Sequence, residues 1–318
     1  MIVVARRLAR LVFVFFVVTF VTFFLLDRAP GDPAERLAGL NATPEVIEGL
    51  REELGLNGSL FERYSRWLGN AVTFDFGDSI VTRGFSSWDL IRESLPKTLE
   101  LMILAEIMAI GIAVPLALAS ARRPGGLIDK VSSSTAFGLL ALPSFVLGIY
   151  MSYLFGVRLG WFPTIVDNLP GLNDDPLENL RQMFLPSLTL ALNLVGVYLR
   201  LLRSDIIETL QQDYVMLAQA RGLSERRIMW RHVLRPSSLN FTTAAGLNVA
   251  GLIGGAFIIE VLFAINGMGR LIIASVLLED FNVVAAAVAI LTIAYVGLNF
   301  IVDLLYAWLD PRIRHGAR

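Results

Sequence analysis

The chain alternates between long apolar segments and polar connections, which predicts a set of membrane-spanning helices. The apolar stretches lie at 11–26, 98–121, 131–157, 184–202, 241–265 and 283–309. Each reaches or approaches the roughly 20 residues that a helix needs to cross the hydrocarbon core of a bilayer. None shows the alternating apolar and polar positions of a barrel strand. The pattern therefore predicts an all-α integral membrane protein with six transmembrane helices.

The first apolar stretch, "LVFVFFVVTFVTFFLL", follows Arg6, Arg7 and Arg10. A cleaved signal peptide also has a basic start and an apolar middle. Here "DRAPGDP" follows directly, without a small-x-small cleavage site. We therefore expect an uncleaved first helix.

Charge divides the connections into two sets. Residues 200–239 hold seven Arg and four acids, whereas residues 27–95 hold seven Arg and twelve acids. The segments 1–10, 119–130 and 309–318 are also basic, and 158–183 is acidic. All the basic segments fall on one side of a six-span arrangement. The excess of Lys and Arg in cytoplasmic loops predicts that both termini are cytoplasmic.

The acidic connection after the first span is long enough to fold. In "NATPEVIEGLREELGLNG", Thr43 is placed as a helix N-cap, Pro44 as the first helical residue and Gly55 as a stop. "LFERYSRWLGN" predicts a second amphipathic helix. We expect two or three short helices outside the cytoplasmic membrane, and hence three parts: 1–27 with the first span, 28–95, and a five-helix core at 96–318.

Composition supports a membrane protein and excludes several kinds of site. The chain is 55% hydrophobic and 17% charged, whereas soluble domains carry about a quarter charged residues. It has no Cys and two His, so a disulfide, a thiolate metal site, a Cys nucleophile and a histidine-built metal site are excluded. It also contains no G-x-x-x-x-G-K-[ST] sequence for binding phosphates.

A basic segment between the fourth and fifth apolar stretches has a different pattern. Residues 218–237 read "AQARGLSERRIMWRHVLRPS". We expect the fourth span to continue as a helix through 203–221 and to end at Gly222, since glycine enters the left-handed cap conformation cheaply. A short amphipathic helix then follows from Ser224 and is closed by Pro236. A DNA-reading helix-turn-helix is disfavoured because two spans tether the segment, so a cytoplasmic protein-docking element at about 203–237 is favoured.

This segment resembles the coupling motif of ABC-importer permeases, which is Glu-Ala-Ala, three residues, Gly, nine residues and Ile-x-Leu-Pro. The chain matches at Ala218, Gly222 and Leu234. It departs at Met216, Leu217 and His232, and its proline, Pro236, comes one residue late. Further blocks resemble the B-type permease subunit of dipeptide, oligopeptide and nickel importers; they include "RAPGDPAERL", "ELGLNGSLFERYSRWL", "ALPSFVLGIYMSYLFGVRLGWFP", "FIIEVLFAINGMGRL" and "VDLLYAWLDPRIRHG".

The resemblance implies a type I ABC-importer permease fold in a bacterial cytoplasmic (inner) membrane. It implies a homologous second permease as heterodimer partner, two ATPase subunits that bind ATP and Mg, and an extracytoplasmic solute-binding protein. It implies no enzyme activity, cofactor or nucleic-acid partner for this chain itself. The residues that it assigns to ATPase coupling are Ala218, Gly222, Leu223, Ser224, Glu225, Arg227 and Leu234.

Polar side chains inside the apolar stretches are the candidates for the translocation path: Glu106, Asn193, Asn248 and Glu260. An acid at the bilayer centre costs about 2.5–3.5 kcal/mol on insertion scales, so such residues usually face the bundle interior or a wet cavity. Contact with the solute and packing between helices are both open for Glu106, and packing is favoured for Glu260. Peptide is the expected cargo, with nickel or another small solute as the alternative. A stand-alone secondary carrier is more remote, because no inverted repeat is evident.

Overall fold

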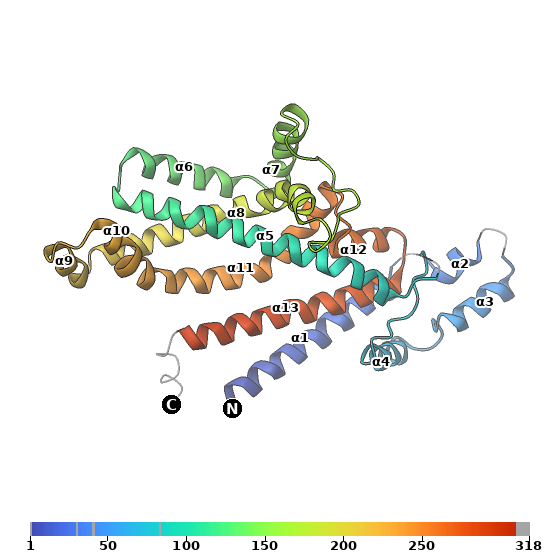
Figure 1. Cartoon of the computed structure of the whole chain (residues 1–318). Helices are drawn as coiled ribbons and strands as arrows, with labels where there is room; N and C mark the ends of the chain where they lie inside the picture. The colour runs from blue at the N-terminus through green and yellow to red at the C-terminus, as the bar shows by residue number, and fades with distance from the viewer. Residues whose placement is uncertain (1, 30, 40–41, 83, 310–318) are drawn as a thin grey trace. The chain divides into compact units, whose positions relative to one another are not determined.

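The computed structural model describes residues 2–29, 31–39, 42–82 and 84–309. Within them the chain is helical, and the one isolated antiparallel bridge joins Asp78 and Ser86. The N-terminal third contains α1 (Ile2–Asp27), α2 (Pro33–Ala38), α3 (Pro44–Glu53), α4 (Leu60–Ala71) and α5 (Ser87–Arg122). The middle contains α6 (Leu127–Ala141), α7 (Ser144–Met151), the π-helix η1 (Ser152–Arg158) and α8 (Pro176–Leu210). The remainder contains α9 (Asp213–Ala220), α10 (Glu225–Arg227), the π-helix η2 (Ile228–Val233), α11 (Leu234–Leu262), α12 (Met268–Leu277) and α13 (Phe281–Leu309) (Figure 1).

Four helical stretches of the described residues are long and apolar enough to cross a membrane, namely Ser87–Arg122, Pro176–Leu210, Glu225–Leu262 and Phe281–Val302. A fifth span arises if the bent pair Leu127–Ala141 and Ser144–Arg158 crosses as one unit. The sixth expected stretch lies in α1, whose described apolar part, Leu11–Asp27, is shorter. The all-helical membrane fold is thus confirmed, while the count of six spans stays a prediction.

The bend between α6 and α7 has an identifiable cause. The chain direction bends by 108° between the two helices, across Leu142 and Pro143. A residue before proline is pushed out of the helical region, and Leu142 has φ −97° and ψ 130°. Pro143 therefore breaks the third apolar stretch.

The chain forms two compact units. The first comprises residues 1–97 and 266–297, and the second comprises 98–265 and 298–318. In the second unit α8 packs against α6, α7 and α11. About two thirds of its apolar window is buried, more than in the other three candidate spans. The buried core of this unit is therefore built around α8.

The first unit contains the expected short helices. Pro44 opens α3 after Thr43, and Gly55 follows the helix with φ +64°, as predicted. A capping box between Ser59 and Glu62 begins α4. The prediction of two or three short helices is confirmed by α2, α3 and α4, although the Thr43 side chain makes no capping hydrogen bond.

A buried carboxylate explains why a late segment belongs to the first unit. Asp280, 2% exposed, accepts hydrogen bonds from Ser79 Oγ (2.5 Å) and from the backbone amides of Ile80 and Val81 (both 3.3 Å). It also caps the first turn of α13 through the amide of Val283. The loop at 79–81 is thereby attached to the start of α13.

Two predicted helix boundaries are wrong. The helix that begins in the fourth apolar stretch ends at Leu210, and a break at residues 211–212 precedes α9, so it does not run through 203–221. Pro236 does not close the short helix after Ser224, because the chain stays helical from Glu225 to Leu262.

Candidate functional site

The predicted coupling segment, residues 203–237, contains a helical hairpin with a glycine turn, formed by α9 on one side and by α10 and η2 on the other. Gly222 has φ +76°, which confirms the predicted left-handed residue after α9. Its amide donates to Gln219 O (2.9 Å), and the amide of Leu223 donates to Ala218 O (3.3 Å). Ser224 then precedes α10 in an extended conformation without a side-chain capping bond. The turn is therefore defined by backbone conformation.

The hairpin has a buried face and an exposed face. Five side chains join the core of the second unit: Val215, Ala218, Ile228, Met229 and Val233. Four large apolar side chains are exposed by 45–54%: Tyr214, Met216, Leu217 and Trp230. Among the predicted coupling residues, Gly222, Ser224, Glu225 and Arg227 are exposed, Leu223 and Leu234 are half-buried, and Ala218 is buried. Ala218 thus packs inward, whereas its neighbours Met216 and Leu217 are available to a partner.

Pro236 is accommodated by a side chain from the other arm of the hairpin. Proline lacks the N–H that would bond to the carbonyl four residues earlier, which here belongs to His232. The Tyr214 hydroxyl donates to that carbonyl at 3.4 Å. This hydrogen bond links α9 to η2, four residues before the proline.

Two polar contacts hold the hairpin and the helices beside it in place. Ser237 Oγ lies 2.8 Å from Thr209 Oγ1, near the end of α8, and donates to Val233 O. Arg122, the last residue of α5, forms an ion pair with Glu225 (Nε to Oε1 3.5 Å). Because both ion-pair partners are exposed, this contact is weak, at about 0–1 kcal/mol.

The strongest polar cluster near the hairpin was not predicted. Asp129, in the first turn of α6, accepts hydrogen bonds from Arg203 Nε (2.5 Å) and Nη2 (2.8 Å) on α8. It also accepts from Ser120 Oγ (2.6 Å) and from the amide of Gly125 (2.7 Å). The sequence feature that could have drawn attention to Asp129 is that it is the single acid of an otherwise basic connection.

A buried tyrosine contacts one path candidate, Glu106, and the helix that carries another, Asn248. Tyr198 of α8 is fully buried, and its hydroxyl donates to Glu106 of α5 (2.9 Å to Oε1). The same hydroxyl lies 3.4 Å from the carbonyl of Ala245, one turn before Asn248 on α11. Asn248 itself donates to Ala244 O at 2.9 Å. Tyr198, absent from the predicted residues, thus connects α5, α8 and α11.

The other two candidates lie in different surroundings. Glu260 is fully buried on α11, and Thr98 of α5 donates to its Oε1 at 2.6 Å. Asn193 is half-buried on α8, and its Oδ1 has no hydrogen-bond partner among the described residues. The four residues therefore do not form one cluster, and within the described part of the chain no group of His, Cys, Asp and Glu is arranged to hold a metal ion.

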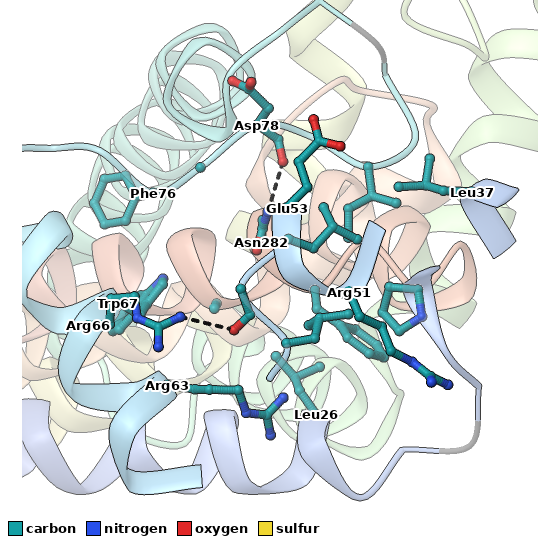
Figure 2. Close-up of a pocket in the computed structure, with 18 of the residues that line it drawn as sticks. Leu26, Leu37, Arg51, Glu53, Arg63, Arg66, Trp67, Phe76, Asp78 and Asn282 are labelled. Carbon is teal, nitrogen blue, oxygen red and sulfur yellow. Dashed lines mark hydrogen bonds between the residues drawn. The ribbon is translucent and has the colours of Figure 1, made fainter. Parts of the chain in front are cut away.

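A hollow in the first unit is lined by residues from α1, α2, α3, α4, the loop at 75–80 and the start of α13. Figure 2 shows Arg63, Arg66 and Trp67 on one side of it, Phe76 near them, and Asn282 donating to the carbonyl of Asp78. Its charged lining consists of three Arg and six acids: Arg51, Arg63, Arg66, Asp27, Asp32, Glu48, Glu53, Asp75 and Asp78. The lining is therefore acidic in sum.

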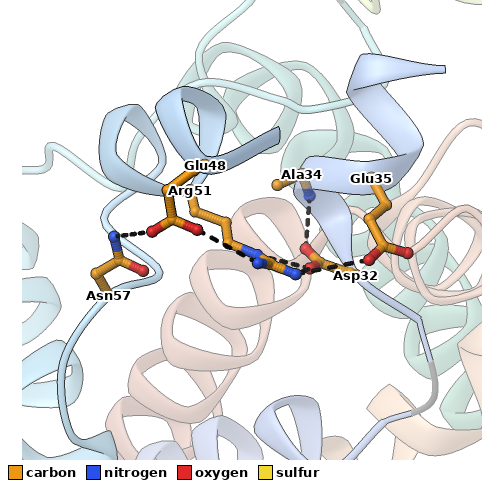
Figure 3. Close-up of polar contacts among 6 residues, drawn as sticks. All are labelled: Asp32, Ala34, Glu35, Glu48, Arg51 and Asn57. Atoms are coloured by element: carbon orange, nitrogen blue, oxygen red, sulfur yellow. Dashed lines mark hydrogen bonds and ion pairs between the residues drawn. The ribbon is translucent and has the colours of Figure 1, made fainter. Parts of the chain in front are cut away.

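Two of the three arginines of this hollow form ion pairs with acids of this unit. Arg51 forms ion pairs with Asp32, Glu35 and Glu48 (Figure 3), and Arg63 forms one with Asp27. Partial burial raises the pKa of Asp32, but hydrogen bonds from Arg51 and from the Ala34 amide outweigh it and lower that pKa overall. No ion pair within the described residues neutralises Glu53, Asp75 or Asp78.

Comparison with known proteins identifies two family models along the chain. "Binding-protein-dependent transport system inner membrane component" matches residues 109–315, and the corresponding N-terminal membrane component matches residues 1–102. Together they account for nearly the whole sequence.

Individual relatives match at full length. The chain is 35% identical over 298 residues to the oligopeptide transport system permease protein AppB of Bacillus subtilis, covering 94% of each chain. It is 32% identical over 315 residues to the glutathione transport system permease protein GsiC of Shigella flexneri, covering 98% of each. Among solved structures, the inward-facing MetNI methionine ABC transporter aligns with a TM-score of 0.56 at 14% identity, over 70% of this chain and 96% of that chain. An amino acid ABC transporter aligns with a TM-score of 0.51 at 18% identity, over 69% and 93%. These two likenesses concern the fold alone.

Proposed function

The chain belongs to the family of binding-protein-dependent transport system inner membrane components, and from this premise we propose that it forms half of the translocation path of an ATP-driven peptide importer. The observation that carries the proposal is the hairpin of α9 and α10. It presents exposed apolar side chains while its other face is anchored in the core. Such a surface suits a protein partner better than water, because large exposed apolar side chains in a cluster favour burial.

The partner that we propose for this surface is an ATPase subunit. Met216 and Leu217 would enter its groove, with Gly222, Ser224, Glu225 and Arg227 at the tip of the hairpin. ATP and Mg would be bound by that partner, and this chain would carry out no chemical step. Closure of the ATPase would displace the hairpin together with α8, which ends just before it, and α11, which continues from it. Thr209 and Ser237 join these two helices to each other next to the hairpin. Rigid-body switching between two packed states would then open the path to alternate sides.

The second permease would contact α11. One face of this helix exposes Leu247, Gly251, Gly254, Ile258 and Val261. A Cβ on Gly251 or Gly254 would meet no atom within 4 Å in the described residues, whereas Gly255 faces Leu190 within the same unit. Small residues permit close approach of membrane helices, so the outward pair suits a helix of the homologous subunit.

Peptide is the proposed cargo because the full-length relatives are named as oligopeptide and glutathione permeases. Nickel is the alternative cargo. An uptake assay distinguishes the two cargoes, because only the transported solute saturates uptake.

Gentle purification of the tagged chain from its native membrane is expected to bring a second permease and one or two ATPases with it. In proteoliposomes with the binding protein, the complex should take up peptide only when ATP is supplied. A chain that arrives alone and moves solute without ATP would instead establish a secondary carrier.

We propose that residues 28–95 lie outside the cytoplasmic membrane and that both termini of the chain lie inside. We propose that the acidic hollow receives a loop of the solute-binding protein that carries a Lys or Arg side chain. Glu53, Asp75 and Asp78 would pair with that cation. Arg63 Nε and Trp67 Nε1, buried donors without a partner among the described residues, would bind the loop's carbonyl oxygens.

Single cysteines test this docking directly, because the native chain has none. Asp78→Cys should react with a membrane-impermeant maleimide and be protected when binding protein is added. Val72→Cys, an exposed position of the same unit that does not line the hollow, should react equally in both conditions. Equal labelling of position 78 with and without binding protein would refute docking at the hollow.

A further inference from the structure

One carboxylate, that of Asp129, holds the turn between α5 and α6 by accepting hydrogen bonds from residues before, within and after the turn. Asp129, with a side chain 7% exposed, accepts from Ser120 before the turn, from Gly125 within it and from Ser133 one turn later. Gly125 has φ +79°, so the turn has a fixed backbone conformation. Arg203 completes the cluster with two hydrogen bonds from α8.

Arg203 lies on the part of α8 that leads into the hairpin. Two turns further along, Thr209 Oγ1 contacts Ser237 at the start of α11, and α9 begins shortly after α8 ends. The cytoplasmic end of α8 is therefore fastened on one side to the α5–α6 turn and on the other to the start of α11, and it leads directly into the hairpin. A displacement of the hairpin would reach α5 and α6 through this end of α8.

A second, direct connection is much weaker. Arg122 and Glu225 join α5 to α10, but their side chains are 41% and 75% exposed. An exposed ion pair between flexible side chains contributes little. The Asp129–Arg203 pair is bidentate and largely buried, and such charge-assisted pairs fix geometry as well as energy. The buried pair is thus the better candidate to transmit movement.

We propose that Asp129 and Arg203 are positioning residues that make the α5–α6 turn move with the coupling segment as one body during the transport cycle. This inference rests on the proposed function, because it assumes that an ATPase drives the hairpin. It adds that coupling requires a pair outside the hairpin itself.

Distance measurements test the common movement. In the assembled complex, spin labels on Arg123→Cys and Gln219→Cys, both exposed positions, report the separation of the turn and α9. With native Asp129 and Arg203 the distance should be the same without nucleotide and after trapping with ATP and vanadate. In an Asp129→Asn background the distance should become nucleotide-dependent. A distance that stays constant in that background would overturn the proposal.

Transport provides the second measurement. Asp129→Asn and Arg203→Gln should each lower peptide uptake per ATP hydrolysed by on the order of tenfold, which lies within the range typical of coupling between two sites. The double variant should be no worse than either single one, because residues of one network are not additive. Arg203→Lys, which keeps the charge but loses the bidentate geometry, serves if Asp129→Asn does not assemble, and should also uncouple uptake.

The matched control is Arg200→Gln. Arg200 lies one turn earlier on α8 and is exposed. Its guanidinium carbon Cζ lies over the Phe137 ring of α6, 5.6 Å from the ring centroid. Its replacement should leave uptake per ATP unchanged. Normal coupling in assembled Asp129→Asn or Arg203→Lys complexes would overturn this inference and leave the proposed function intact. Failure of the native chain to bind an ATPase would instead overturn the proposed function.

Discussion

Replacing Gly222 with valine is expected to abolish most transport while leaving the chain folded. Gly222 has φ +76°, and a left-handed conformation costs an L-residue about 1–2 kcal/mol and is a genuine outlier for a β-branched one. Since about 1.4 kcal/mol corresponds to a factor of ten, we expect ATP-dependent uptake to fall on the order of tenfold or more. Uptake in proteoliposomes, normalised to assembled complex, measures it.

The effect of backbone conformation at position 222 on uptake can be distinguished from the effect of side-chain bulk. A Cβ at Gly222 would meet nothing within 4 Å in the described residues, so no clash is expected within this chain. Gly222→Asn, which tolerates the left-handed region, should retain more uptake than Gly222→Val. Gly160 is a matched control, because it also has a positive φ, +67°, and open space around it; Gly160→Val should spare coupling. Equal losses for Asn and Val at position 222 would show that bulk, and not conformation, is what the turn excludes.

The fold was predictable where one local signal decides the structure. Apolar runs of membrane length located the long helices, since a backbone in hydrocarbon must satisfy its own hydrogen bonds. The start of α3 at Pro44 and the stop at Gly55 followed from proline and glycine chemistry. The family resemblance was confirmed by models that match both parts of the chain.

At one of the two wrong boundaries a distant contact accompanies the departure from the local signal. Proline at position 236 predicts an end, yet the helix continues. Tyr214, 22 residues earlier, donates to the carbonyl of His232, the residue four before this proline. Sequence spacing gives no indication of that contact, because it depends on how the hairpin closes.

The polar contacts of the site were the least predictable part. The sequence identified Glu106 and Glu260 as acids in apolar runs, but it could not show that Tyr198 and Thr98 face them. It located Ala218 by its motif position, whereas burial decides that Met216 and Leu217 face outward. Asp129 and Arg203 are 74 residues apart, and only the packing of α6 on α8 brings them together.

Replacing Gly196 is expected to have the largest effect on stability. Gly196 is buried on α8 where α6 crosses it. An added Cβ would lie 3.0 Å from the backbone oxygen of Ala136 and 2.9 Å from Leu140 Cγ. The Leu140 side chain can turn about its χ1 bond, but the backbone carbonyl of Ala136 cannot, so α6 and α8 must shift apart at this point. Overpacking of this kind typically costs 1–3 kcal/mol, and we expect Gly196→Ala to lower the thermal unfolding midpoint in detergent and Gly196→Leu to lower it further.

Replacing Gly138 with alanine is expected to have the opposite effect on the thermal unfolding midpoint. Gly138 lies exposed on α6, and a Cβ there would meet nothing within 4 Å in the described residues. In a helix interior alanine is favoured over glycine by about 1 kcal/mol, so Gly138→Ala should leave the unfolding midpoint unchanged or raise it. Opposite signs at positions 138 and 196 would attribute the effect to the α6–α8 contact, because helix propensity is the same at both. If Gly196→Ala instead raised the midpoint, the close packing of α6 against α8 would be wrong, and with it the seating of Asp129 against Arg203 at the end of the same helix pair.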